Sequence, residues 1–147
     1  MVCIAALAIT GCAAPAARNK ESWTQKADPD FVQLVNGLAG EDARDCGFHY
    51  YSRVDGENYA GRRGRECALA AMRDRRPFKY ATARVPIDSV AVETLIGAPD
   101  GTLWYLDFGA GLDEAVLTGI SYRCTSLDID RWTFVITHRD CVRQPLP

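Results

Sequence analysis

The sequence holds few side chains that could carry catalysis. His49 and His138 are its two histidines, and an imidazole is the usual general base near neutral pH. A hydrolytic Ser-His-Asp site also needs an oriented serine, and the sequence has no Gly-x-Ser-x-Gly elbow. The serines considered have no nucleophile context: Ser52, Ser89, Ser121 and Ser126. We interpret both histidines as surface or loop residues and expect no catalytic residue, no cofactor and no enzyme activity.

Acidic pairs and short glycine motifs could bind ions, but each has a simpler interpretation. Asp113-Glu114 and the pair Asp128/Asp130 could hold Ca²⁺ or flank a glycosidic bond, yet both are expected in turns, where acids are common. Gly109-Ala110-Gly111 lacks the strand-to-helix context of a nucleotide site. The run Gly61-Arg62-Arg63-Gly64 could cradle an anion, but it is more typical of a plain turn. We therefore expect no metal site.

Aromatic residues could stack on sugar rings if they are exposed. The candidates are Trp104, Tyr105, Trp132, Tyr50 and Tyr51. Trp104 and Trp132 fall in expected strands, where packing in the core is the commoner role of tryptophan. We therefore interpret these two residues as core.

The amino terminus has the pattern of an export signal. Residues 2–10, Val-Cys-Ile-Ala-Ala-Leu-Ala-Ile-Thr, form an uncharged and mostly apolar run. The run is too short to span a bilayer, which takes roughly 20 residues, and its length fits the apolar core of a secretory signal. It ends in Ile9-Thr10-Gly11-Cys12, which resembles the lipobox of bacterial lipoproteins.

The lipobox resemblance implies a location. In bacterial lipoproteins the motif cysteine is acylated and begins the mature chain, so residues 1–11 would be the signal peptide and Cys12 would carry fatty chains such as palmitate. Two or more chains hold a protein stably on a membrane, at roughly 0.8 kcal/mol per buried methylene. Ala13 follows in place of Asp, which in the enterobacterial sorting pattern implies the outer membrane, facing the periplasm. Residues 12–27 are expected to be a flexible tether, and 28–147 a single domain.

Four cysteines remain once Cys3 leaves with the signal and Cys12 takes lipid: Cys46, Cys67, Cys124 and Cys141. An even number of cysteines in an exported domain implies two disulfides. Three connectivities are possible, and we favour the two pairs of neighbours, Cys46–Cys67 and Cys124–Cys141, because near pairs form most readily. Each closed loop would stabilise the fold by roughly 3 kcal/mol. A zinc site is disfavoured because no C-x-x-C spacing occurs.

The pair Cys124–Cys141 carries a geometric condition. If residues 120–127 and 132–138 formed a straight hairpin, Cys141 would lie roughly 20 Å from Cys124. A disulfide needs Cα atoms within about 7 Å. The chain must therefore bend back around residues 138–140, or the pairing is different.

Charge is unevenly distributed along the chain, although the net charge is −2. Residues 62–84 hold eight basic and two acidic side chains, and residues 86–130 hold eight acidic and one basic. The simplest interpretation is that the two segments face each other or are solvated separately. The alternative is a basic face for an anionic partner such as lipid phosphate or wall polymer. Its candidate residues are Arg62, Arg63, Arg65, Arg73, Arg75 and Arg76. The bulk charge argues against nucleic acid as a partner.

Local patterns place the elements of the domain. An acidic cap, a proline and an apolar stripe of period 3.6 predict a helix over residues 29–38. Strong helix formers before Pro77 predict a second helix over 65–76. The expected strands are 78–85, 89–96, 102–108, 120–127 and 132–138, with turns at 99–101 and 128–131. The polar segment Gly47–Gly64 is interpreted as a long loop.

Two helices followed by a run of strands predict an α+β fold. We expect both helices to pack on one face of a four- to five-stranded antiparallel meander that disulfides staple. This layout resembles that of small Gram-negative envelope lipoproteins, a resemblance of layout alone that carries no functional residues.

The sequence thus favours a lipid-anchored envelope protein that acts as a non-catalytic binding or structural module. Its partners would be the membrane and an anionic envelope component or another envelope protein. One alternative is an inhibitor or sequestering protein of a periplasmic cell-wall hydrolase, with Phe48–Arg65 as the projecting segment. The other is a small periplasmic enzyme, which would need a deep pocket that joins a histidine to two carboxylates.

Overall fold

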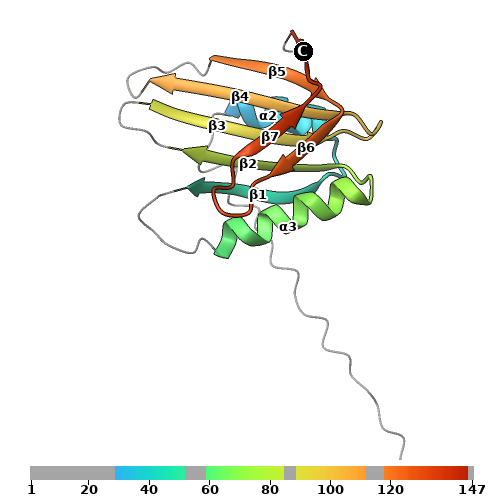
Figure 1. Cartoon of the computed structure of the whole chain (residues 1–147). Helices are drawn as coiled ribbons and strands as arrows, with labels where there is room; N and C mark the ends of the chain where they lie inside the picture. Colours follow the sequence, from blue (N-terminus) through green and yellow to red (C-terminus); the bar gives the residue numbers. More distant parts are fainter. Residues whose placement is uncertain (1–28, 52–58, 85–88, 112–117, 146–147) are drawn as a thin grey trace, which may run out of the picture.

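A computed structural model describes residues 29–51, 59–84, 89–111 and 118–145. Two helices and eight strands lie within these ranges (Figure 1). They are α2 (Pro29–Ala39), β1 (Arg44–Tyr51), α3 (Tyr59–Arg73), β2 (Phe78–Arg84), β3 (Ser89–Gly97), β4 (Leu103–Gly111), β5 (Thr118–Cys124), β6 (Ser126–Ile129), β7 (Ile136–Arg139) and β8 (Val142–Gln144).

The main sheet is mixed and has six strands in the order β1-β2-β3-β4-β5-β8. The neighbours β1 and β2 are parallel, and α3 makes the crossover that such a pair requires. The remaining neighbours are antiparallel. Strands β6 and β7 pair only with each other and form a separate hairpin.

The sheet is covered on both faces. In Figure 1, α2 lies behind the sheet, while α3 and the β6–β7 hairpin lie in front of it. Behind the sheet, Phe31 and Val35 of α2 join a core that includes Ile96 and Leu106. In front, α3 and the hairpin enclose a second core, whose members include Ala68, Leu95, Tyr105 and Ile129. The four strands β1 to β4 therefore supply buried side chains to both faces of the sheet.

Several local predictions are confirmed. The α+β class is correct, the first helix occupies Pro29–Ala39, and the turn at residues 99–101 joins β3 to β4. In that turn, Asp100 Oδ1 accepts the Thr102 amide at 2.9 Å, and Gly101 adopts the positive φ of 84° that glycine allows. Both favoured disulfides, Cys46–Cys67 and Cys124–Cys141, are present.

The prediction that both helices pack on one face of an antiparallel meander is wrong. The cause is β1, which the sequence analysis placed in a loop. Strand β1 makes α3 a crossover between two parallel neighbours, so α3 lies on one face. Helix α2, which precedes β1, covers the opposite face.

The long loop predicted over Gly47–Gly64 is also wrong, because β1 and the first turns of α3 occupy most of it. The β1 register shifts between Asp45 and Phe48, and Gly47 has a φ of 96°, so the strand lacks regular alternation. Gly64 is buried where α3 meets β1. A Cβ on Gly64 would lie 2.7 Å from the Cys46 carbonyl oxygen, so this glycine serves close packing rather than a turn.

The hairpin expected of residues 120–127 and 132–138 is replaced by two separate pairings. Strand β5 ends at Cys124 and pairs with β4 and β8, whereas β6 begins at Ser126 and pairs with β7. The chain reverses at Asp140, whose φ is 49°. This reversal brings the Cα atoms of Cys124 and Cys141 to 4.1 Å, which meets the condition that the sequence set for this disulfide.

Candidate functional site

Part of the predicted site lies outside the described residues. This part comprises the signal peptide 1–11, Cys12 and the tether 12–27. Ser52 and the acidic pair Asp113-Glu114 also lie there. Their assignments stay predictions.

The predicted basic residues are not one patch. Arg62 and Arg63 are exposed in the first turns of α3, so the run that contains them is helical and not the expected turn. Arg73, Arg75 and Arg76 are exposed at or beyond its last turn. The two groups are separated by about 15 Å along the helix, at 1.5 Å per residue.

Arg65 differs from the other predicted arginines, because its side chain is half-buried. Its Nε donates a hydrogen bond of 2.6 Å to the carbonyl oxygen of Ile129 in β6. This contact ties the first half of α3 to the β6–β7 hairpin. Arg65 is therefore a structural link between the two elements that cover the front face of the sheet.

The turn between β6 and β7 presents two side chains to solvent. Trp132 is 72% exposed, and the Arg131 guanidinium lies 5.0 Å from the centroid of its ring. The prediction that Trp132 packs in the core is wrong, because the residue falls in the turn rather than in a strand. Trp104, by contrast, is half-buried in β4 and packs against the core behind the sheet.

A capping carboxylate fixes this exposed turn. Asp130 Oδ1 accepts hydrogen bonds from the Trp132 amide at 2.9 Å, the Thr133 amide at 2.6 Å and the Thr133 hydroxyl at 2.8 Å. The Thr133 amide is the main cause that holds the pKa of Asp130 below its ordinary value. The cap therefore stays ionised at neutral pH, and Trp132 is held outward by a turn of defined shape.

The turn lies beside the start of α3, as the Arg65 contact requires and as Figure 1 shows. Arg62 is exposed and lies three positions before Arg65, on the same side of α3, so it shares one end of the front layer with the exposed side chains of the turn. We call this group the basic–aromatic patch: Arg62, Arg131 and Trp132.

A buried polar cluster, which the sequence analysis missed, lies on the front face of the sheet. Glu93 of β3 has a side chain only 8% exposed, and its Oε2 lies 2.7 Å from Arg84 Nη2. Its Oε1 accepts a hydrogen bond of 3.0 Å from the Tyr105 hydroxyl. Among the described residues, the hydroxyls of Tyr80 and Thr82 are buried without a hydrogen-bond partner. The Arg84–Glu93 pair also joins the basic segment of the chain to the acidic one.

A sequence signal for Glu93 did exist. The strand Ser89–Gly97 is apolar at most positions on both faces, so a carboxylate in its middle is expected to be buried and to need partners. What the sequence could not provide was the identity of those partners, because Arg84 and Tyr105 reach Glu93 only through the register of three strands.

Two buried tyrosines should resist ionisation. Burial is the main cause that raises the pKa of both Tyr80 and Tyr105 above the ordinary value of 10.0, and the negative charge of Glu93 adds to it. The unfolded chain loses these protons near pH 10 while the folded chain keeps them. The contribution of these two tyrosines to stability is therefore constant below about pH 10 and falls as the pH rises above it.

This expectation can be checked by following phenolate absorbance and circular dichroism during alkaline titration. We expect two tyrosines to ionise only when the protein unfolds. In the Tyr105→Phe variant, only one tyrosine should ionise together with unfolding. Normal titration of every tyrosine near pH 10 with native circular dichroism would contradict the burial argument.

His49 and His138 lie on different elements and have different partners. His49 lies in β1 rather than in a loop, is half-buried, and its Nε2 is 3.1 Å from the Cys46 carbonyl oxygen. His138 is exposed on β7, with its ring 4.6 Å from that of Tyr105 and 5.9 Å from that of Tyr122. The described residues contain no group of three or more His, Cys, Asp or Glu side chains that could hold a metal ion.

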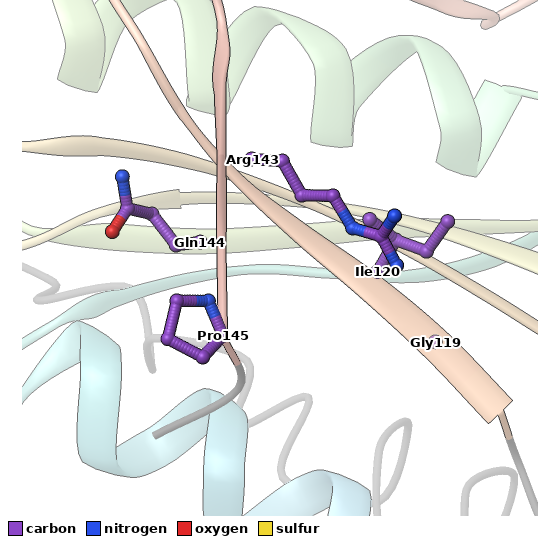
Figure 2. Close-up of a pocket in the computed structure, with 5 residues that line it drawn as sticks. All are labelled: Gly119, Ile120, Arg143, Gln144 and Pro145. Carbon is purple, nitrogen blue, oxygen red and sulfur yellow. The ribbon is translucent and has the colours of Figure 1, made fainter.

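A shallow hollow lies at the edge of the sheet opposite β1, where β8 pairs with only part of β5 (Figure 2). Its volume is about 370 Å³, and it is lined by Gly119, Ile120, Arg143, Gln144 and Pro145. Figure 2 shows the Arg143 side chain beside Ile120. Arg143 is the only charged residue of this lining, so the hollow offers contact surface rather than acid–base chemistry.

No protein-family model matches the chain, and neither a curated protein nor a solved structure matches it. None of the helices in the described ranges has the length and apolar character that crossing a membrane requires.

Proposed function

We propose that this chain is a bacterial envelope lipoprotein. It is exported, acylated on Cys12 and held at the outer membrane, and its domain faces the periplasm. The domain acts as a non-catalytic binding or structural module for another envelope component. Exposed arginine at the start of α3 is the surface offered to an anionic partner.

The observation that supports this proposal is the pairing of the cysteines. All four cysteines of the described residues are joined as Cys46–Cys67 and Cys124–Cys141. Structural disulfides persist in oxidising compartments and are rare in the bacterial cytoplasm. A domain built in this way fits the compartment beyond the inner membrane, which is where an acylated Cys12 would place it.

The same pairing leaves Cys12 for acylation, because none of the four domain cysteines is bonded to it. The absence of catalysis in this proposal rests on the placement of the acids and bases. Glu93 is closed in by Arg84 and Tyr105, while His49 and His138 lie on different elements with other partners. Of the segment Phe48–Arg65 that the inhibitor alternative would project, β1 and α3 take both ends, and residues 52–58 lie outside the described residues.

The anchor is tested by Cys12→Ala in cells. We expect the wild-type protein in the membrane fraction, and the variant either in the soluble fraction or unprocessed, because it has no thiol to acylate. Cys3→Ala is the matched control and should leave both processing and membrane attachment unchanged. Mass spectrometry of the wild-type amino-terminal peptide should show a diacylglyceryl group on Cys12, and an uncleaved, unmodified leader would contradict the proposal.

A further inference from the structure

An exposed tryptophan on a rigid turn is the feature that the proposed function leaves unused. Of the large apolar side chains in the described residues, Trp132 is the most exposed, at 72%. Exposing an indole to water has a free-energy cost that is proportional to its exposed apolar area. The three hydrogen bonds to Asp130 Oδ1 hold the turn in this shape, so the exposure is built in and points to a partner surface.

The neighbours of Trp132 define the chemistry of that surface. Arg131 lies over its ring, and the exposed Arg62 stands at the adjacent start of α3. Guanidinium groups bind phosphate through paired hydrogen bonds, and indole rings settle at the headgroup level of bilayers. The two carboxylates of the hairpin accept hydrogen bonds from the backbone of the same hairpin. Asp128 accepts one from the Ile129 amide at 2.8 Å, and Asp130 accepts one from the Trp132 amide.

We propose that the basic–aromatic patch docks on the phospholipid bilayer that carries the anchor, with Trp132 at headgroup depth and the arginines on lipid phosphates. This inference rests on the proposed function, because a tether makes a weak contact effective. Tethering converts docking into an intramolecular event at high effective concentration. The domain would then lie on the membrane with α3 and the β6–β7 turn toward the lipid.

The length of the linker permits this orientation. About 17 residues separate Cys12 from the start of α2 at Pro29, and they span at most about 60 Å. A domain of this size has a radius of gyration of roughly 13 Å. The chain can therefore pass from the α2 side of the sheet, around the domain, to the membrane in front of α3.

The shape of the site favours a bilayer over a wall polymer. Trp132 is exposed at a turn, and the Arg131 guanidinium covers the ring face on which a sugar would stack. The hollow lined by Arg143 lies at the β5–β8 edge of the sheet. This edge is opposite β1 and α3, so the hollow is not part of the basic–aromatic patch.

The test attaches the mature chain to vesicles by chemistry, so that its result does not depend on acylation in cells. Oxidised protein that begins at Cys12 is coupled through that thiol to a maleimide lipid in phosphatidylethanolamine–phosphatidylglycerol vesicles. Lipids brominated near the headgroup quench any tryptophan at that depth. The emission of Trp132 is the difference between this protein and its Trp132→Phe variant.

We expect the Trp132 emission to shift to the blue and to be quenched at least twofold. The double variant Arg62→Glu/Arg131→Glu should lose at least half of that quenching. Arg75→Glu/Arg76→Glu, at the other end of α3, is the matched control and should leave it unchanged.

Trp132 emission that stays solvent-like and unquenched would overturn the docking proposal. Quenching that is insensitive to the Arg62 and Arg131 substitutions would also overturn it, because the patch would not be the contact. A blue shift on purified wall sacculi without one on vesicles would assign the patch to a glycan polymer instead. Failure of the Cys12→Ala fractionation alone would remove the natural anchor and leave these vesicle results standing.

Discussion

Loss of both disulfides is expected to remove a large part of the stability of the domain. The Cys46–Cys67 bond closes a loop with a sequence separation of 21, and Cys124–Cys141 closes one of 17. Loop-closure entropy then assigns about 3 kcal/mol to each bond. The two bonds lie on different elements, so their contributions should roughly add to about 6 kcal/mol. Domains of this kind have about 5 to 15 kcal/mol in total.

Urea unfolding measures this effect. Cys46→Ala/Cys67→Ala and Cys124→Ala/Cys141→Ala should each lower the free energy of unfolding by about 3 kcal/mol, and reductant should affect the wild type more than either variant. Unchanged unfolding midpoints in both double variants would contradict the prediction. The functional consequence is that the protein is about 6 kcal/mol more stable in an oxidising compartment, which fits the proposed envelope location.

Replacement of Glu93 by alanine is expected to lower the free energy of unfolding by about 3 kcal/mol. The substitution removes the acceptor of the Tyr105 hydroxyl, which is buried, and the counter-charge of Arg84. An uncompensated buried partner costs several kcal/mol. We expect a loss near the lower end of the range for buried ion pairs, because the Arg84 side chain is 39% exposed and stays in contact with water.

Two variants isolate the cause of this loss. Glu93→Gln keeps an acceptor for Tyr105 and removes the charge, so we expect about half of the alanine effect. Asp107→Ala removes the carboxylate directly opposite Glu93 in the β3–β4 register, but Asp107 is exposed, and the change should stay within about 0.5 kcal/mol. Equal losses in Glu93→Ala and Asp107→Ala, measured by urea unfolding, would refute the buried-cluster argument.

Local features of this protein were readable from its sequence. The start of α2 at Pro29, the turn at residues 99–101 and the strands that flank it depend on signals from residues a few positions apart. The cysteine pairing followed from proximity along the chain, and even the required bend near residue 140 could be deduced from distance alone. These signals sufficed for the α+β class and for both disulfides.

Strand β1 shows where local reading fails. Its bulge between Asp45 and Phe48 removes the alternation by which strands are recognised. The glycines that let α3 pack closely on it resemble turn residues. The prediction of a loop there led directly to the wrong placement of the two helices.

The sequence by itself determined the elements with strong local signals, the disulfide pairs and the uneven charge, because each depends on short-range chemistry. Only the tertiary structure decided which face each helix covers, which arginines share a surface with Trp132, and that Arg84 and Tyr105 enclose Glu93. Those outcomes depend on strand register and on layer packing, which bring together residues far apart in the chain. No local pattern specifies such contacts, since they are set by the joint burial of apolar surface across the whole domain.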